Sequence, residues 1–243
     1  MKQQPFNKEV GFPLTDRHFR KEARYAILWQ EKAVSRPYYF LKRIMDTGLA
    51  IVLLVFVLSW LIPLLCLIIF IDTGAPMFFV QKRVGLNGKI FFCYKLRTMY
   101  SKQGNINKKP SRLGQLLRDH KLDELPQIVN VLRGDMSMVG PRPHMLSDHE
   151  IFSQAIGKRY HLRHVLKPGI TGLAQIGGYE GSITSLHKLR GRIRLDLFYI
   201  KNWSLGLDFL IIFKTIGHIL KGILRKQNQE KKPEQMVHHD RNK

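Results

Sequence analysis

Two neighbouring carboxylates carry the clearest chemical signal in the sequence. Asp123 and Glu124 form the only adjacent pair of acids in the chain. Basic residues surround this pair in the sequence, at Arg112, Arg118, Lys121, Arg133 and Arg142. Nearby positive charge favours the ionised form of a carboxylate, which is the form that acts as a nucleophile or binds a metal ion. An Asp-Glu pair that opens a helix is, however, more often a cap than a catalytic group. Both readings are open from these residues alone.

Other basic residues are placed to bind phosphate. Strand alternation puts Lys95 and Arg97 on one face of an expected strand, as either a phosphate clamp or an ordinary solvated surface. Residues 140–143 (Gly-Pro-Arg-Pro) hold the guanidinium of Arg142 between two prolines, which suits either a grip on phosphate or a plain turn.

A long apolar segment precedes these residues. From Gly48 to Ile71 the chain has 24 residues without a charge. As a straight helix this is about 36 Å at ~1.5 Å per residue, against about 30 Å of bilayer hydrocarbon. Pro63 interrupts the hydrogen-bond ladder, and basic residues flank both ends of the segment. A helix that bends at Pro63 and returns fits both features, whereas a spanning helix with a tolerated proline fits the length.

The elements between the apolar segment and the acids predict how the site is built. Met77–Val84 and Lys89–Thr98 have strand character, and Asn87-Gly88 supplies the positive φ angles of a tight hairpin. A short helix is expected over Ser111–Asp119.

A second helix is expected to begin near Asp123 and to stop at Gly134, with Pro126 in its first turn. The acid pair is then expected at a helix N-terminus, where the helix dipole favours negative charge.

The remaining segments have simpler patterns. Residues 204–225 carry a basic stripe opposite an apolar one, which suits a helix in the membrane interface or, alternatively, a core helix. Residues 168–178 are glycine-rich and predict turns and short extended pieces. We expect a polar helix over 17–34, a polar loop over 101–110 and disorder over 226–243.

Composition limits the class of protein. The chain has 40 Lys and Arg against 18 acids, a formal charge of +22, so anionic partners are expected: phospholipid headgroups, phosphorylated substrates or nucleic acid. Its two cysteines, Cys66 and Cys93, predict neither a disulfide framework nor a paired-cysteine metal site. The length suits one domain with a membrane segment and tails.

Together these features resemble the monotopic phosphoglycosyl transferases, the bacterial sugar transferase family that primes exopolysaccharide, capsule and O-antigen synthesis on undecaprenyl phosphate. The resemblance runs from about Lys42 to Ile216. Its motifs are Lys42-Arg43 with Asp46, Phe78-Phe79 with Gln81, Arg83 and Gly85, residues 94–99, residues 122–143, residues 167–172, and Asp196 with Tyr199. The stretch from Asp123 to Pro143 carries most of the weight.

The resemblance implies an α+β fold for a mostly helical monotopic membrane protein. Its expected parts are a polar and aromatic N-terminal segment (1–41), a re-entrant membrane helix broken at Pro63 (42–75), a cytoplasmic catalytic domain with a small β-hairpin (76–203), an interfacial amphipathic helix (204–225) and a disordered tail (226–243).

The resemblance also implies a reaction. Asp123 attacks the β-phosphate of a UDP-sugar, UMP leaves, and undecaprenyl phosphate then attacks the sugar-phosphoryl aspartate. Glu124 is implied as a Mg²⁺ ligand. Phosphate-binding or site-organising roles are implied for Lys95, Arg118, Arg142 and Asp196. Arg97 is a further candidate because it shares a strand face with Lys95. The chemistry is consistent, because carboxylates form acyl phosphates and Mg²⁺ prefers hard oxygen ligands.

The implied partners are a UDP-sugar, undecaprenyl phosphate and anionic phospholipid, with no nucleic acid. The implied location is the cytoplasmic face of the bacterial inner membrane. The sequence leaves open which sugar is transferred, which polysaccharide pathway is served and whether the protein forms a homo-oligomer.

The sequence departs from the family pattern in three places. Three residues separate Ser59 from Pro63, where the family often has serine directly before the proline. Leu173 replaces a common tryptophan, and His120-Lys121 replaces a usual hydroxyl pair. These departures are expected to alter substrate contacts rather than the reaction.

Two alternatives stand beside this hypothesis. A non-enzymatic, basic, membrane-tethered protein that binds nucleic acid or anionic lipid explains the charge, but not an acidic pair beside an arginine loop. A transferase that works by a single displacement, without a covalent step, explains both.

Overall fold

The computed structural model describes residues 36–99 and 110–230, with side chains at 39–99 and 110–222. The expected polar helix over 17–34, most of the expected loop over 101–110 and residues 231–243 of the expected tail lie outside the described residues. In chain order the elements are α2 (Arg36–Leu53), the π-helical turn η1 (Leu54–Leu58), α3 (Ser59–Thr73), β1 (Phe78–Val84), η2 (Leu86–Gly88), β2 (Ile90–Leu96), α4 (Arg112–Asp119), η3 (Leu122–Glu124), α5 (Gln127–Arg133), β3 (Ser137–Val139), α6 (Leu146–Ile156), α7 (Lys158–His161), η4 (Leu162–Val165), β4 (Gly169–Thr171), α8 (Leu173–Ile176), α9 (Leu186–Lys201) and α10 (Leu205–Glu230).

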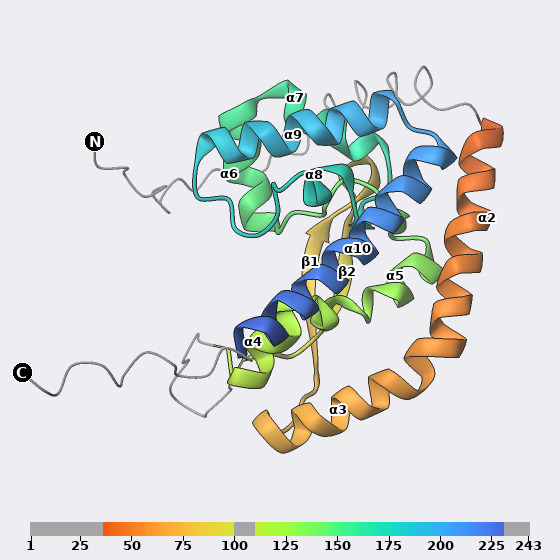
Figure 1. The fold of residues 1–243 in the computed structure, drawn as a ribbon. Coiled ribbons are helices and arrows are strands. Elements are labelled where there is room, and N and C mark those ends of the chain that lie inside the picture. The colour runs from red at the N-terminus through yellow and green to blue at the C-terminus, as the bar shows by residue number, and fades with distance from the viewer. Residues whose placement is uncertain (1–35, 100–109, 231–243) are drawn as a thin grey trace, which may run out of the picture.

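A bent apolar helix forms one side of the molecule. Helical structure runs without a gap from Tyr39 to Thr73, long and apolar enough to cross a membrane. Figure 1 shows that α2 and α3 meet at a steep angle instead of forming one straight rod. The irregular turn is the π-helical stretch Leu54–Leu58, and Pro63 lies inside α3. The bend therefore precedes the proline that was expected to mark it.

The position of the bend has a local cause. Pro63 has no N–H for the carbonyl of Ser59, and its ring crowds that carbonyl, so the disturbance falls on the turn before the proline. Ser59 opens α3 directly after the π-helical turn, and its hydroxyl donates to the Val55 carbonyl at 2.6 Å. Despite its distance from Pro63 in sequence, Ser59 thus lies at the bend.

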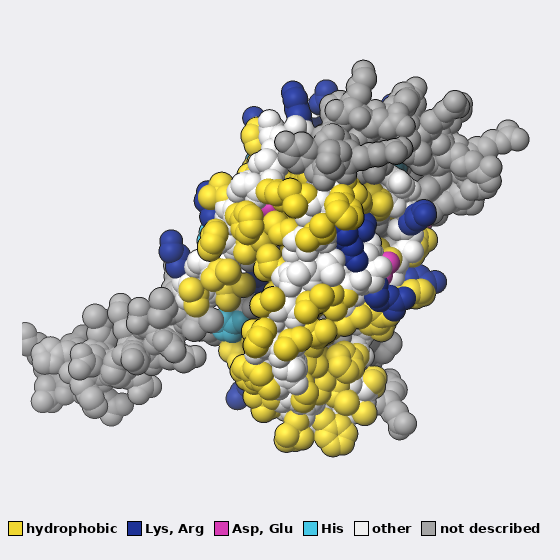
Figure 2. All heavy atoms as spheres, turned by 90° about the vertical axis from the view of Figure 1, so that its right-hand side faces the viewer, with side chains coloured by type: hydrophobic (Ala, Val, Ile, Leu, Met, Phe, Trp, Pro, Cys, Tyr) yellow, Lys and Arg dark blue, Asp and Glu magenta, His cyan; other side chains and the backbone are white. Residues whose placement is uncertain are grey.

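The bent helix exposes a broad apolar surface. Figure 2, turned toward this side, shows hydrophobic side chains over most of it, with lysine and arginine at its edges. Exposed members include Phe40, Ile44, Ile51, Val52, Val55, Phe56, Trp60, Leu64, Leu67, Phe70 and Ile71. A patch of this size on a soluble protein marks a protein or membrane contact, and here it belongs to a helix of membrane-crossing length.

The predicted hairpin is confirmed. β1 and β2 pair antiparallel, with Val84 opposite Ile90. Asn87 and Gly88 in the connecting turn have φ angles of 53° and 75°. A second, parallel pair joins β3 and β4. Cys66 is partly buried, Cys93 is buried, and both are free thiols.

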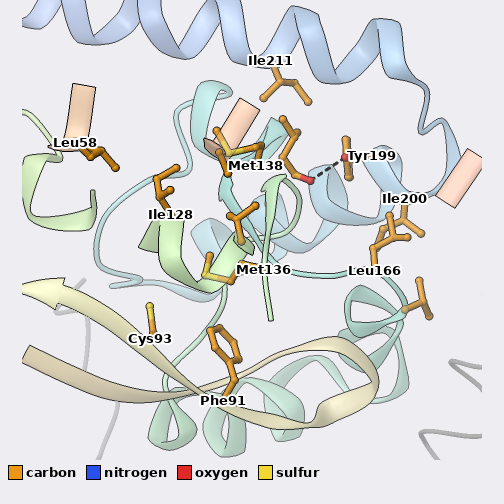
Figure 3. Close-up of a cluster of buried hydrophobic side chains, with 14 residues drawn as sticks. Leu58, Phe91, Cys93, Ile128, Met136, Met138, Leu166, Tyr199, Ile200 and Ile211 are labelled. Atoms are coloured by element: carbon orange, nitrogen blue, oxygen red, sulfur yellow. Dashed lines mark hydrogen bonds between the residues drawn. The ribbon is translucent and has the colours of Figure 1, made fainter. Parts of the chain in front are cut away.

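The main hydrophobic core joins distant segments (Figure 3). Cys93 from β2, Ile128 from α5 and Ile211 from α10 are all buried in it. Ala50 and Leu58, from the upper arm of the bent helix, are buried in the same cluster. A second cluster packs Leu65 and Ile69 of α3 against Leu96 and Leu117. Both arms of the bent helix therefore pack on the same body of the protein.

The amphipathic C-terminal segment forms a helix, as predicted. α10 continues to Glu230, so the expected disorder over 226–243 is wrong for 226–230, whose Lys, Gln and Glu residues are good helix formers. Ile211 is fully buried, whereas Phe209, Phe213, Ile216 and Leu220 are exposed. The helix therefore uses one part of its apolar surface for the core and leaves another part uncovered.

Candidate active site

The acid pair lies in a turn that the sequence placed differently. Asp123 and Glu124 belong to the 3₁₀ turn η3, and the helix expected to start near Asp123 starts at Gln127 instead. The reason is Pro126, because it cannot donate the hydrogen bond to the Leu122 carbonyl that would carry an α-helix through the acids. The acids thus precede the helix. The favourable effect of the helix dipole on residues of the first turn, which was predicted for them, therefore does not apply. The helix stop at Gly134 is confirmed, with a φ of 87°.

Glu124 is held by two cationic side chains. Lys95 Nζ donates to its Oε1 at 2.6 Å. Arg142 donates to both of its oxygens, one of them at 3.0 Å. Burial alone would raise the pKa of Glu124, but Arg142 and Lys95 hold it well below its usual value. Glu124 is therefore an ionised carboxylate engaged with charged donors on both oxygens.

Asp123 has the opposite environment. It is only 8% exposed, and no hydrogen bond or ion pair reaches its carboxylate from the part of the chain that the structure describes. Burial raises its pKa above the usual value, and the charge of Glu124 raises it further. The sequence argument predicted that nearby cations would dominate this group, and that prediction is wrong for Asp123. The cations Lys95, Arg118 and Arg142 offset only part of the shift.

This difference matters for chemistry because a carboxylate with a raised pKa is more basic, and basicity favours nucleophilic attack. Of the two acids, Asp123 is the one without a competing partner among the described residues.

Two arginines that the sequence reasoning missed as site residues hold the loop of Arg142. Arg163 donates to the Arg142 carbonyl at 2.6 Å, and Arg83 donates to the Pro143 carbonyl at 2.6 Å. Arg163 is fixed in turn by Asp196, whose Oδ2 accepts from it at 2.8 and 3.1 Å. Asp196 therefore positions the Arg142 loop through Arg163. Arg83 was part of a family motif, whereas nothing local distinguishes Arg163.

The remaining predicted residues fall in two places. Arg118 donates to the Thr98 hydroxyl at 2.7 Å and contributes to the electrostatics of Asp123. Arg97 donates to the carbonyls of Thr73, Gly74 and Ala75, at the C-terminal end of α3. The strand pairing ends at Leu96, so alternation no longer fixes the direction of the next side chain. The expected clamp of Lys95 and Arg97 does not form, because only Lys95 reaches the acid pair.

A third acid, Glu180, forms an ion pair with Lys121 just before the acid pair. Glu180 Oε1 lies 2.7 Å from Lys121 Nζ, and Lys121 is two residues before Asp123. Sequence reasoning missed Glu180 because a single acid in a glycine-rich loop carries no pattern.

The donor set fits Mg²⁺ only with help from a ligand. No group of three or more His, Cys, Asp or Glu residues suited to a metal occurs within the described ranges. Mg²⁺ is commonly bound by one or two carboxylates together with substrate phosphates. Asp123 and Glu124 supply such carboxylates, although both oxygens of Glu124 also accept from cationic donors.

The fold combines a long, exposed apolar helix with a buried acid pair among cations. Residues 37–222 match the family described as bacterial sugar transferase. This chain therefore belongs to the bacterial sugar transferase family.

Several relatives have named activities. Over 201 residues the chain is 37% identical to the UDP-glucose:undecaprenyl-phosphate glucose-1-phosphate transferase of Escherichia coli, which covers 78% of this chain and 42% of that protein. A protein of the same name from Caulobacter vibrioides is 38% identical over 187 residues, 74% of this chain and 69% of that protein. An Aeromonas hydrophila protein, UDP-N-acetylgalactosamine-undecaprenyl-phosphate N-acetylgalactosaminephosphotransferase, is 38% identical over 195 residues, 76% of this chain and 45% of that protein. The match thus spans less than half of the Escherichia coli and Aeromonas relatives.

Proposed function

We propose that the protein transfers a sugar 1-phosphate from a UDP-sugar to undecaprenyl phosphate through a covalent intermediate on Asp123. One observation carries the proposal: of two adjacent buried acids, Glu124 is engaged on both oxygens, whereas Asp123 has a raised pKa and no partner among the described residues. The names of the relatives supply the substrate class.

In the first step an Asp123 oxygen bonds to the β-phosphorus of the UDP-sugar. The bond from that phosphorus to the bridging oxygen breaks, and UMP leaves with the electron pair. The charges of Lys95, Arg118 and Arg142 act on Asp123, and we propose that they stabilise the phosphate oxygens of the reacting group. Mg²⁺, held by Glu124 and the diphosphate, would neutralise charge on the leaving nucleotide.

In the second step a phosphate oxygen of undecaprenyl phosphate attacks the same phosphorus. The bond to Asp123 breaks, which restores the carboxylate and releases undecaprenyl diphosphate sugar. Two displacements avoid a direct encounter of two anionic substrates, because each meets the enzyme separately.

We place the protein at the cytoplasmic face of the bacterial inner membrane, anchored by a re-entrant helix. Both arms of the bent helix pack on the same protein body, through Ala50 and Leu58 in one arm and Leu65 and Ile69 in the other. A spanning helix would carry one arm away from that body. The exposed apolar surface would contact lipid tails, and the surplus of lysine and arginine would contact anionic headgroups.

The test is to incubate purified protein with a panel of UDP-sugars and Mg²⁺, without lipid acceptor. We expect UMP release and a mass increase of one sugar phosphate, mapped to Asp123 by mass spectrometry. Asp123→Asn should show neither. Asp135→Asn is the matched control, because Asp135 is a partly exposed acid paired with Arg133.

The outcomes separate the alternatives. Product formation with acceptor but without any adduct would support a single displacement. No nucleotide release from any UDP-sugar, combined with salt-sensitive DNA binding that Asp123→Asn leaves unchanged, would support the non-enzymatic alternative.

A further inference from the structure

We call η3 (Leu122–Glu124) the acid turn. The loop between α8 and α9 brings a third carboxylate, that of Glu180, to the residue just before this turn. Glu180 forms its ion pair with Lys121 at 2.7 Å, and the side chains of Lys121 and Glu180 are 30% and 35% exposed. The charge of Glu180 also acts on Arg142. Burial lowers the pKa of Arg142, Glu124 raises it above its usual value, and Glu180 raises it by a smaller amount. Glu180 therefore lies near two cations of the proposed site and remains accessible to a ligand.

The backbone around Glu180 is held from the protein interior. Arg192, only 4% exposed, donates to the Tyr179 carbonyl at 2.9 Å and to the Gly181 carbonyl at 2.7 Å. One buried guanidinium thus binds the carbonyls on both sides of Glu180. The Tyr179 ring packs so closely on α9 that a Cβ at Gly191 would come within 2.0 Å of it. These contacts fix the position of Glu180 without help from Lys121.

The other end of the ion pair is fixed as well. Lys121 has a φ of 58°, an uncommon conformation for a residue with a side chain. Its N–H donates to the Arg118 carbonyl at 3.1 Å, and its carbonyl accepts from the Glu124 N–H at 3.2 Å. Such backbone conformations persist where the surroundings determine them, and they concentrate at functional sites. Both charges are therefore presented by rigid backbone.

The chemistry of Glu180 selects the part of a substrate that it can bind. A carboxylate repels phosphate oxygens and accepts hydrogen bonds from hydroxyl groups. In an in-line displacement the leaving nucleotide lies opposite the attacking Asp123 oxygen, so the sugar lies to the side of that line. Lys121 is two residues from Asp123 in the chain, and Glu180 acts on the charge of Arg142, so the ion pair borders the proposed site.

Resting on the proposed function, we propose that Glu180, with Lys121, binds hydroxyl groups of the hexose in the UDP-sugar and contributes to the choice of sugar. Lys121 donates to hydroxyl oxygens and balances the charge of Glu180. The pair is then a specificity element that lies beside the catalytic carboxylate and takes no part in the phosphoryl transfer itself.

The test compares binding of a UDP-hexose with binding of UDP, which lacks the sugar. Binding is measured by calorimetry in an Asp123→Asn background, so that turnover does not interfere, with UDP-glucose, UDP-galactose, UDP-N-acetylgalactosamine and UDP. Adding Glu180→Gln should weaken binding of the preferred UDP-hexose by roughly tenfold or more, the loss of a hydrogen bond to a charged acceptor. The affinity for UDP should stay within about twofold, because UDP lacks the hexose that Glu180 would contact, and the loss of a partly exposed ion pair should disturb the fold little. The spread of affinities among the three hexoses should narrow.

Glu150→Gln is the matched control, because Glu150 is a half-buried acid on α6, and it should change no affinity. Equal weakening of UDP and UDP-hexose would show a structural role and overturn the subsite. Unchanged affinities would overturn it as well, and in both cases UMP release by the parent enzyme would leave the proposed function standing. Failure of the parent protein to bind or turn over any UDP-hexose would instead overturn the proposed function and the subsite together.

Discussion

Among the described residues, buried carboxylates lie beside a lysine in two places, and the two places differ in how completely the charges are paired. At the junction of α2, α9 and α10, Asp208 is fully buried. Lys42 donates to its Oδ2 at 2.6 Å and Trp203 to the same oxygen at 3.1 Å. The Tyr199 hydroxyl donates to its Oδ1 at 2.6 Å. We call Lys42, Tyr199, Trp203 and Asp208 the anchor cluster.

The acid turn starts from similar components and leaves one charge unmatched. Lys95 and Arg142 engage Glu124 as fully as the anchor cluster engages Asp208. Asp123, the adjacent residue, is buried to the same degree as Glu124 without such partners among the described residues. A matched buried carboxylate fixes the fold, whereas an unmatched one is destabilising and is retained where chemistry needs it.

The largest expected effect concerns Asp123. Asp123→Asn should reduce UMP release by about a thousandfold or more, since the nucleophile is lost. Its folded-state pKa is raised, so at neutral pH the ionised carboxylate destabilises the folded protein. The variant should therefore unfold at the same temperature as the parent or at a higher one, measured by thermal unfolding in detergent. A clear loss of stability would mean that Asp123 has a partner in the folded state.

The next effect concerns the anchor cluster. Asp208→Asn leaves Lys42 without its closest carboxylate and should destabilise the protein by about 3–5 kcal/mol, the usual result of breaking a buried ion pair. Chemical denaturation measures this, with Asp135→Asn as the control at a partly exposed ion pair. UMP release per folded molecule should persist, because within the described residues Asp208 hydrogen-bonds to Lys42, Tyr199 and Trp203 and not to the acid turn. Unchanged stability would contradict the contrast between the two clusters.

The third effect is a pH dependence of the stability that Glu124 contributes to the fold. Its folded-state pKa lies below the ordinary value of 4.5, so its stabilising contribution is complete above that value and is lost as pH falls toward the folded-state pKa. Glu124→Gln should therefore be less stable than the parent at pH 7, and the difference should shrink below about pH 4.5. Unfolding free energies across pH 3–7 measure it. A gap that stays constant over this range would indicate that lost packing, not lost charge, explains the variant.

The smallest effect is a shift of the acidic limb of the pH–rate profile toward higher pH. Because burial and Glu124 raise the pKa of Asp123 above 3.8, kcat/KM should fall on acidification at a pH above that value. The acidic limb of kcat/KM reports the pKa of the free enzyme. It is measured as the rate of UMP release at low UDP-sugar concentration. A rate that stays constant down to pH 4 would argue against Asp123 as the titrating nucleophile.

Several elements were predictable because their signals are local, whereas the helices α6, α7 and α9 were not predicted. Asn87-Gly88 fixed the hairpin turn, Gly134 ended a helix in the left-handed conformation, and the amphipathic pattern marked α10. The bend and the acid turn were misplaced by a few residues, because a proline affects the turn before it as well as its own position. Pro63 and Pro126 both show this effect.

The surplus of positive charge was only partly interpreted. It predicted anionic partners, but the structure also uses arginines inside the protein as donors to backbone carbonyls. In the part of the chain that the structure describes, five arginines do this: Arg43, Arg83, Arg97, Arg163 and Arg192. Such a use depends on where distant carbonyls come to lie, which no local pattern contains.

By itself the sequence determined the long apolar helix, the hairpin, the amphipathic helix and the acid pair as a candidate site, since these follow from periodicity, turn residues and neighbouring residue types. Tertiary structure decided which acid is paired and which is not, that Lys95 and not Arg97 reaches Glu124, and that Glu180 pairs with Lys121 just before the two acids. The physical reason is that desolvation and charge pairing depend on distances across the fold. Residues far apart in the chain set those distances.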